Sequence, residues 1–235
     1  MTGFRTRAQD LPAEFAVFPL SGALLLPRGR LPLNIFEQRY LAMTEDSLAN
    51  GRMFAMIQPD TALPETANGP ALFRVGCLGR LSSFSETEDG RLLITLTGIA
   101  RFSIASEVDM RRGYRRVIGD FSRYLADLND PGDTPIDREG MIGALRGYFA
   151  RRAVEPNWDA INRLADDALV VTLAMVCPFE PIEKQALLEA PNEAERADTL
   201  LALLRMGAAA SPGLSGGPSG EPGDDDADER PRRLS

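Results

Sequence analysis

The sequence contains no histidine, and Lys184 is its only lysine, so 25 of its 26 basic residues are arginine. Without histidine the chain cannot form a Ser-His-Asp or Cys-His nucleophile, a histidine-ligated metal site or an imidazole acid–base pair. A phosphate-binding loop of the G-x-x-x-x-G-K-[ST] type is also excluded, because Lys184 lies between Glu183 and Gln185 with no glycine nearby. These absences leave carboxylate chemistry or no catalysis, and we expect no catalytic residue, no metal site and no cofactor.

Cysteines, long apolar runs and excess positive charge are scarce too. Cys77 and Cys177 are too few for a disulfide framework, so we expect free thiols in a reducing compartment. No apolar run reaches the roughly 18 residues of a membrane-spanning helix. The stretch over residues 15–26 is interrupted by Pro19 and Gly22, which favours a strand over an export signal. We therefore expect a cytoplasmic protein without membrane contact, and its net charge of −8 disfavours nucleic acid as a partner.

The first half of the chain reads as strands. Apolar segments bounded by glycine or turn residues predict strands at 15–18, 53–57, 72–81, 91–97, 100–104 and 114–121. One helix is predicted over residues 37–50, with Gly51 ending it. Short strands with glycine corners are typical of a bent antiparallel barrel. We predict such a barrel over residues 15–124, preceded by a flexible N-terminus at 1–14.

The second half reads as helices, so the predicted fold class is α+β. A turn-rich linker over residues 125–135 precedes a predicted helical bundle at 134–207. Its helices are expected to begin near Pro135, Asn157 and Pro181 and at the capping box of Asn192 and Glu195, with Gly207 closing the last. Residues 208–235 have the composition of a disordered acidic tail, with a docking tail as the alternative.

Several segments resemble a known family in order and spacing. They are FPL (residues 18–20), LPLNIFEQRY (31–40), VGCLGRL (75–81), DGR with GIARF (89–91 and 98–102) and KQALLE (184–189). Together they resemble the amino-terminal, substrate-binding domain of bacterial Lon proteases, over residues 15–206. Asn34, Gln38 and Cys77 stand where many relatives have His, Pro and Thr, and none of these departures removes a catalytic group.

The resemblance implies a PUA-like pseudo-barrel followed by a helical bundle, and a function in recognising polypeptide substrates. It also implies a stand-alone module, because the chain lacks the lysines that the family's ATPase and Ser-Lys peptidase modules use. The expected clients are unfolded or exposed polypeptide segments, with a separate protease or chaperone as their recipient.

The candidate polypeptide-binding residues are Leu25, Arg28, Arg30 and Phe36. The segment over residues 24–30 places three leucines beside an arginine-bearing loop with a glycine, which is suited to a shallow apolar surface rimmed by charge. The first and third of these leucines fit a buried strand better. An exposed sheet edge is a further possibility, because it binds extended peptides through backbone groups alone.

A nucleic-acid-binding barrel is the alternative hypothesis. Arg111, Arg112, Arg115 and Arg116 flank Tyr114 and could bind phosphates. The same arginines occupy a predicted strand and hairpin, where charges also prevent edge-to-edge pairing of sheets.

A carboxylate hydrolase ranks last. Glu37 suits a helix start beside Arg39, where a carboxylate stabilises the helix dipole. Asp166 and Asp167 are adjacent on a predicted helix, so their side chains diverge by about 100° and do not converge on one substrate atom.

Overall fold

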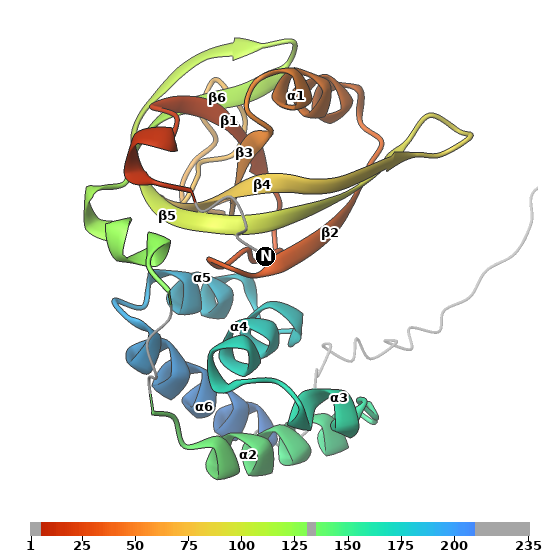
Figure 1. Cartoon of the computed structure of the whole chain (residues 1–235), viewed down its shortest axis with the longest axis vertical. Coiled ribbons are helices and arrows are strands. Elements are labelled where there is room, and N and C mark those ends of the chain that lie inside the picture. The colour runs from red at the N-terminus through yellow and green to blue at the C-terminus, as the bar shows by residue number, and fades with distance from the viewer. Residues whose placement is uncertain (1–5, 131–134, 210–235) are drawn as a thin grey trace, which may run out of the picture.

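The computed structural model describes residues 6–130 and 135–209 and shows two lobes, a β-barrel followed by a group of helices (Figure 1). The strands are β1 (Glu14–Pro19), β2 (Arg30–Ile35), β3 (Met53–Ile57), β4 (Val75–Glu86), β5 (Leu92–Arg111) and β6 (Tyr114–Asp120). The helices are α1 (Gln38–Ala49), α2 (Arg138–Arg151), α3 (Trp158–Asn162), α4 (Asp166–Val176), α5 (Pro181–Glu189), α6 (Glu193–Ala209) and the 3₁₀ helices η1 (Ala8–Asp10) and η2 (Ser122–Leu128). The predicted α+β class is confirmed.

The barrel closes because β5 is long enough to pair with different strands along its two halves. The strand order is β2-β5-β4-β3-β1-β6, and β5 also pairs with β6. The first part of β5 pairs with β2 and β4, and its second part with β4 and β6. All pairs are antiparallel except β1 with β3, which is parallel. The strand β2 is therefore attached at one side only and forms an edge of the sheet.

Two strand predictions need correction near β2. The two strands predicted over residues 91–97 and 100–104 form one strand, β5, which begins at Leu92 and in which Gly98 sits at a β-bulge rather than at a corner. A Cβ atom at Gly98 would lie 2.0 Å from the carbonyl oxygen of Leu26, so only glycine allows this close approach. Leu24 and Leu26 are buried, but they lie in a loop rather than a strand, and β2 itself was not predicted.

The helical lobe also departs from the prediction in two places. The helix expected from Asn157 onward is two helices, because the chain is extended at Ala165 between α3 and α4. Gly207 does not end α6, which continues to Ala209. A Cβ atom at Gly207 would lie 2.6 Å from the ring of Tyr148, so this glycine serves helix packing. The proposed tail beyond residue 209 and residues 1–5 of the proposed N-terminus lie outside the described residues.

A buried arginine joins the lobes. Arg101 on β5 is 4% exposed and donates hydrogen bonds to both carboxylate oxygens of Asp127 in η2, each at 2.9 Å. Its guanidinium also donates to the carbonyl oxygens of Leu188 and Ala190 at the end of α5. Buried charges persist when they are paired and fully hydrogen-bonded. Arg101 therefore fixes the barrel, the connecting segment and the helical lobe relative to one another.

The single lysine belongs to the same junction. Lys184 of α5 donates to the carbonyl oxygen of Gly22 at 2.6 Å, and burial lowers the pKa of its ammonium group. Gln185 donates to the carbonyl oxygen of Val75 and accepts from Gln58. The side chains of Lys184 and Gln185 thus hold the helical lobe against the barrel through backbone and side-chain hydrogen bonds.

Candidate functional site

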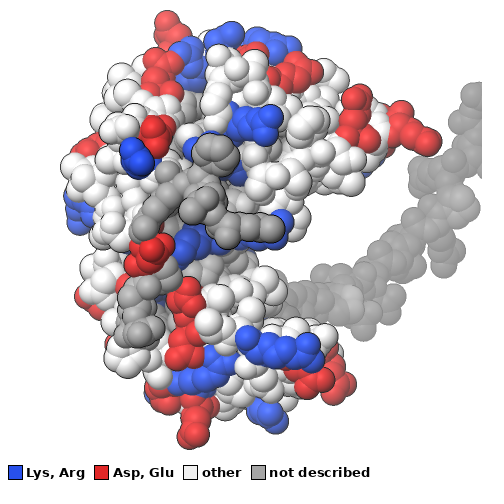
Figure 2. Space-filling view, in the orientation of Figure 1, with Lys and Arg blue, Asp and Glu red and all other residues white. Residues whose placement is uncertain are grey.

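A hollow separates the two lobes on one side of the molecule, and its visible walls are mostly uncharged apart from basic side chains near the junction of the lobes (Figure 2). The strand β2 lies on the barrel side and α4 on the helical side (Figure 1). The walls meet where Gly29, just before β2, packs against α4. A Cβ atom on Gly29 would lie 2.3 Å from the sulfur of Met175, so the absence of a side chain allows this contact.

The barrel wall is an open sheet edge. Among the residues that the structure describes, β2 pairs with β5 and with no other strand. Leu31 and Leu33 are partly buried, whereas Arg30, Pro32 and Asn34 are exposed. Edge strands present unpaired backbone N–H and C=O groups, which are able to pair with another extended chain.

The helical wall is the exposed side of α4, and it is uncharged beyond the first turn. Thr172 and Val176 are exposed on this side, Val176 to 69%, and Ala168 and Met175 are partly buried. The buried side of α4 consists instead of residues 169–171, 173 and 174, which pack into the shared core.

The β4–β5 hairpin projects outward from the barrel lobe (Figure 1). Exposed apolar side chains lie on this hairpin and just after β2. Phe84 is 56% exposed, Leu93 47%, and Phe36, just after β2, 61%. The guanidinium of Arg91 lies 5.8 Å from the centre of the Phe36 ring. Phe84 lies opposite Ile94 and Leu93 lies opposite Asn34, so the two exposed side chains are on opposite faces of the hairpin.

The four residues predicted to bind polypeptide have different environments. Leu25 is 1% exposed and belongs to the core, with its side chain directly beside Gly79, so it is not available for contact. Arg28 forms an ion pair with Glu193 at the start of α6. Arg30 and Phe36 are exposed at the two ends of β2. The structure thus places three of the four along one stretch of surface, while the leucine lies beneath it.

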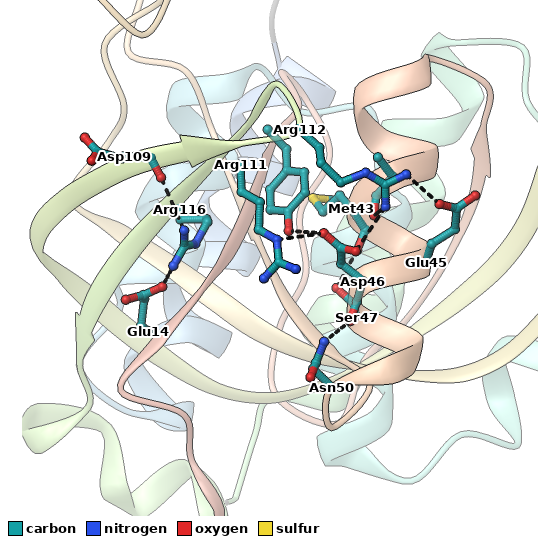
Figure 3. A network of polar contacts seen from close by, with 12 residues as sticks. Glu14, Met43, Glu45, Asp46, Ser47, Asn50, Asp109, Arg111, Arg112 and Arg116 are labelled. Atoms are coloured by element: carbon teal, nitrogen blue, oxygen red, sulfur yellow. Dashed lines mark hydrogen bonds and ion pairs between the residues drawn. The ribbon is translucent and has the colours of Figure 1, made fainter.

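The arginines of the alternative hypothesis are all paired with carboxylates, and Figure 3 shows Arg111, Arg112 and Arg116 with their partners. The pairs are Arg111–Asp46 (3.2 Å), Arg112–Glu45 (2.9 Å), Arg112–Asp46 (3.0 Å), Arg115–Glu107 (2.5 Å) and Arg116–Glu14. A tight turn with φ of +49° at Arg112 and +84° at Gly113 brings the β5–β6 hairpin against α1. A phosphate would have to compete with these carboxylates for each arginine.

Asp46 is the centre of this network and makes it sensitive to acid. The Tyr114 hydroxyl donates to Asp46 at 2.7 Å, and this bond and those from Arg112 lower the pKa of the carboxyl below its ordinary 3.8. A lowered folded-state pKa contributes stability that is present above pH 3.8 and lost as the pH falls through the folded-state value.

We expect the stability advantage of the wild type over Asp46→Asn to be constant above about pH 5 and to shrink below it, in urea unfolding followed by circular dichroism. An advantage that does not change down to about pH 2 would contradict this role.

Two of the carboxylates considered for a hydrolase are held in ion pairs. Asp166 forms an ion pair with Arg138 at 2.5 Å, and Glu37 pairs with Arg39 at 2.9 Å. Both cysteines are free and buried, as predicted, and burial raises the pKa of Cys177 to about 12. Across residues 6–130 and 135–209, no three acidic, cysteine or histidine side chains are grouped to hold a metal ion. No helix among these residues is long and apolar enough to span a membrane.

Comparison with known proteins adds independent information. A family model described as the ATP-dependent protease La (LON) substrate-binding domain matches residues 14–206. The Lon protease of Anaeromyxobacter dehalogenans is 24% identical over 96 residues, and Lon protease 2 of Thermus thermophilus is 24% identical over 203 residues. These matches span 41% and 83% of this chain but only 11% and 24% of the relatives.

The fold has a counterpart among solved structures. A crystal structure of a Lon N-terminal domain protein from Xanthomonas campestris superimposes with a TM-score of 0.54 at 21% sequence identity. The match covers 80% of this chain and 97% of that one. At this identity the likeness concerns the fold alone.

Proposed function

Because the chain belongs to the ATP-dependent protease La (LON) substrate-binding domain family, as its sequence motifs indicated, we propose that it binds unfolded or exposed polypeptide segments in the hollow between its lobes. Family membership gives it a substrate-recognition role linked to proteolysis. The proposal adds that this chain acts by binding alone, without hydrolysing its clients, and that a separate protease or chaperone receives them.

The open edge of β2 facing the uncharged side of α4 is the observation that carries the proposal. Unfolded chains expose apolar side chains and unpaired backbone groups together, and this hollow is complementary to both. The exposed Phe84 extends the apolar face of Leu31 and Leu33 onto the projecting hairpin. Nucleic acid is not a favoured ligand, because Arg111, Arg112 and Arg116 are engaged by acidic neighbours.

Val176→Lys tests the hollow directly. Val176 is 69% exposed at the end of α4, where a cation is compatible with the helix dipole, so the variant should fold. We expect its affinity for a reduced, carboxymethylated polypeptide, measured by fluorescence anisotropy, to fall about tenfold, because a bound chain loses an apolar contact. The client should be recovered uncut, and its binding to the wild type should change little between low and high salt, unlike phosphate-driven binding.

Val154→Lys is the matched control, because Val154 is 48% exposed but lies after α2, outside the hollow. Equal losses for the two variants would contradict the proposed site. A steep fall of affinity with salt, together with tight RNA binding, would replace the proposal by the nucleic-acid alternative.

A further inference from the structure

The outer edge of β2 has a defined hydrogen-bonding pattern. Pro32 lies opposite Thr95 in an uninterrupted ladder with β5, and proline has no N–H to give to that ladder. Backbone groups alternate between the two sides of a strand, so those of Pro32 point away from β5. The N–H of Gly98 donates to the carbonyl oxygen of Gly29 at 2.8 Å, so the carbonyl group of Gly29 faces β5. Because the direction alternates along the strand, odd-numbered residues of β2 face β5 and even-numbered residues face away from it, in agreement with Pro32. The backbone groups of Arg30, Pro32 and Asn34 therefore face outward.

Side chains on β2 alternate in burial with the same period. Leu31 and Leu33 are partly buried on the side of the core, while Arg30, Pro32 and Asn34 are exposed on the opposite face. A chain added beside β2 would continue both faces. Its residues opposite Leu31 and Leu33 would contact apolar surface, and those opposite the three exposed residues would face solvent.

The charges at the two ends of β2 are opposite. Arg30 begins the strand, and the hairpin next to its other end carries Glu86, Glu88 and Asp89, of which Asp89 pairs with Arg91. The projecting tip is acidic in Figure 2. An antiparallel partner would place its N-terminal end near this tip and its C-terminal end near Arg30. Coulomb attraction then favours a basic N-terminal end and an acidic C-terminal end.

We propose that β2 binds an extended polypeptide segment as an added antiparallel strand, with apolar side chains at alternate positions, a basic residue at its N-terminal end and an acidic one at its C-terminal end. This inference rests on the proposed function and names the conformation and the sequence class of the bound segment. It excludes helical segments, whose backbone groups are already paired internally.

The geometry assigns different roles to alternate amides of the ligand. Residues opposite Arg30 and Asn34 exchange hydrogen bonds with β2, whereas the residue opposite Pro32 only donates its N–H to the Pro32 carbonyl oxygen, and these three are the ligand's polar residues. The apolar residues, opposite Leu31 and Leu33, direct their amides to solvent. Methylation of a polar residue's amide nitrogen removes a hydrogen bond at the interface, whereas methylation at an apolar residue does not.

A labelled octapeptide, Lys-Val-Ser-Leu-Thr-Ile-Ser-Glu, tests this assignment by fluorescence anisotropy. N-methylation at the central Thr should weaken binding about tenfold, and N-methylation at the neighbouring Leu should change it less than about twofold. Exchanging the terminal Lys and Glu should weaken binding at low salt, and the difference should disappear at high salt.

Asn34→Pro tests the protein side of the same contact. The substitution removes the outward N–H of residue 34 and leaves the pairing with β5 intact, and Leu33 before it already has the extended conformation that proline requires. We expect affinity for the octapeptide to fall about tenfold, whereas Asn34→Ala, which keeps the N–H, should stay within about twofold of the wild type. Thermal melts of both variants establish that they fold.

The outcomes separate the two proposals. Equal effects of the two N-methylations, or of Asn34→Pro and Asn34→Ala, would overturn strand addition while leaving polypeptide binding that depends on Val176 intact. Self-association through β2 that the octapeptide does not disrupt would also overturn it, because the edge would then belong to a second copy. Loss of all polypeptide binding by the wild type would instead refute the proposed function.

Discussion

Arg101→Met is expected to lower the free energy of unfolding by about 3–5 kcal/mol, because it removes one partner of a buried ion pair. Asp127 would keep its charge in a site where its side chain is 9% exposed, and the carbonyl oxygens of Leu188 and Ala190 would lose their donor. Methionine fills part of the same volume, so the loss reflects charge and hydrogen bonding more than an empty cavity. Urea unfolding followed by circular dichroism measures it.

Two further variants make the Arg101 result interpretable. Arg91→Met disrupts the ion pair with Asp89, in which both side chains are at least half exposed, and should change stability by less than about 1 kcal/mol. Arg101→Met combined with Asp127→Asn removes the stranded charge and should recover part of the loss. A loss below about 1 kcal/mol for Arg101→Met would show that the junction does not depend on this pair.

Gly98→Ala is expected to destabilise the protein by about 3 kcal/mol, at the upper end for an overpacked site. The new methyl group would meet the backbone oxygen of Leu26 at 2.0 Å, and a backbone atom moves less readily than a side chain. Relief of the clash would break the hydrogen bonds from Arg28 to Gly98 and from Gly98 to Gly29. Both lie in the loop that leads into β2, so peptide affinity should fall together with the melting temperature.

Gly143→Ala is the control for the intrinsic effect of replacing a glycine. Gly143 lies in α2, and nothing lies within 4 Å of the position its Cβ atom would take. Alanine there should stabilise the protein by about 0.5–1 kcal/mol, because it is the better helix former. If the two alanine variants changed stability in the same direction, the close approach of the loop to β5 would not be the reason that residue 98 is glycine.

Elements that depend on local chemistry were predicted well. The helix expected over residues 37–50 is α1, and Gly51 after it has φ of +76°, the left-handed conformation that glycine adopts readily. Asn192 caps α6 as expected, with the N–H of Glu195 donating to its side-chain oxygen at 2.9 Å, while the return bond to Glu195 comes from the Asn192 side-chain amide rather than from its backbone N–H. Such signals involve residues three or four apart, so the sequence displays them directly.

The candidate site was predicted only in part. Arg30 and Phe36 are exposed beside the hollow, but Leu25 is in the core, because the loop containing it folds against Gly79 of β4. The α4 wall was missed, since Val176 looks like any other apolar residue of a buried helix until its neighbours are known. One signal was available: Pro32 inside an apolar run is typical of an edge strand.

Residue types alone excluded histidine and P-loop chemistry, divided the chain into a strand-rich and a helix-rich part, and revealed the family through short motifs. They did not show why several motif residues are where they are. Arg101, Lys184 and Gln185 look like surface residues in the sequence, yet they are buried between the lobes and satisfy backbone carbonyls far along the chain. Whether a charged side chain is buried, and whether the edge of a strand is left unpaired, depends on which distant segments pack together. Only the folded molecule shows this packing.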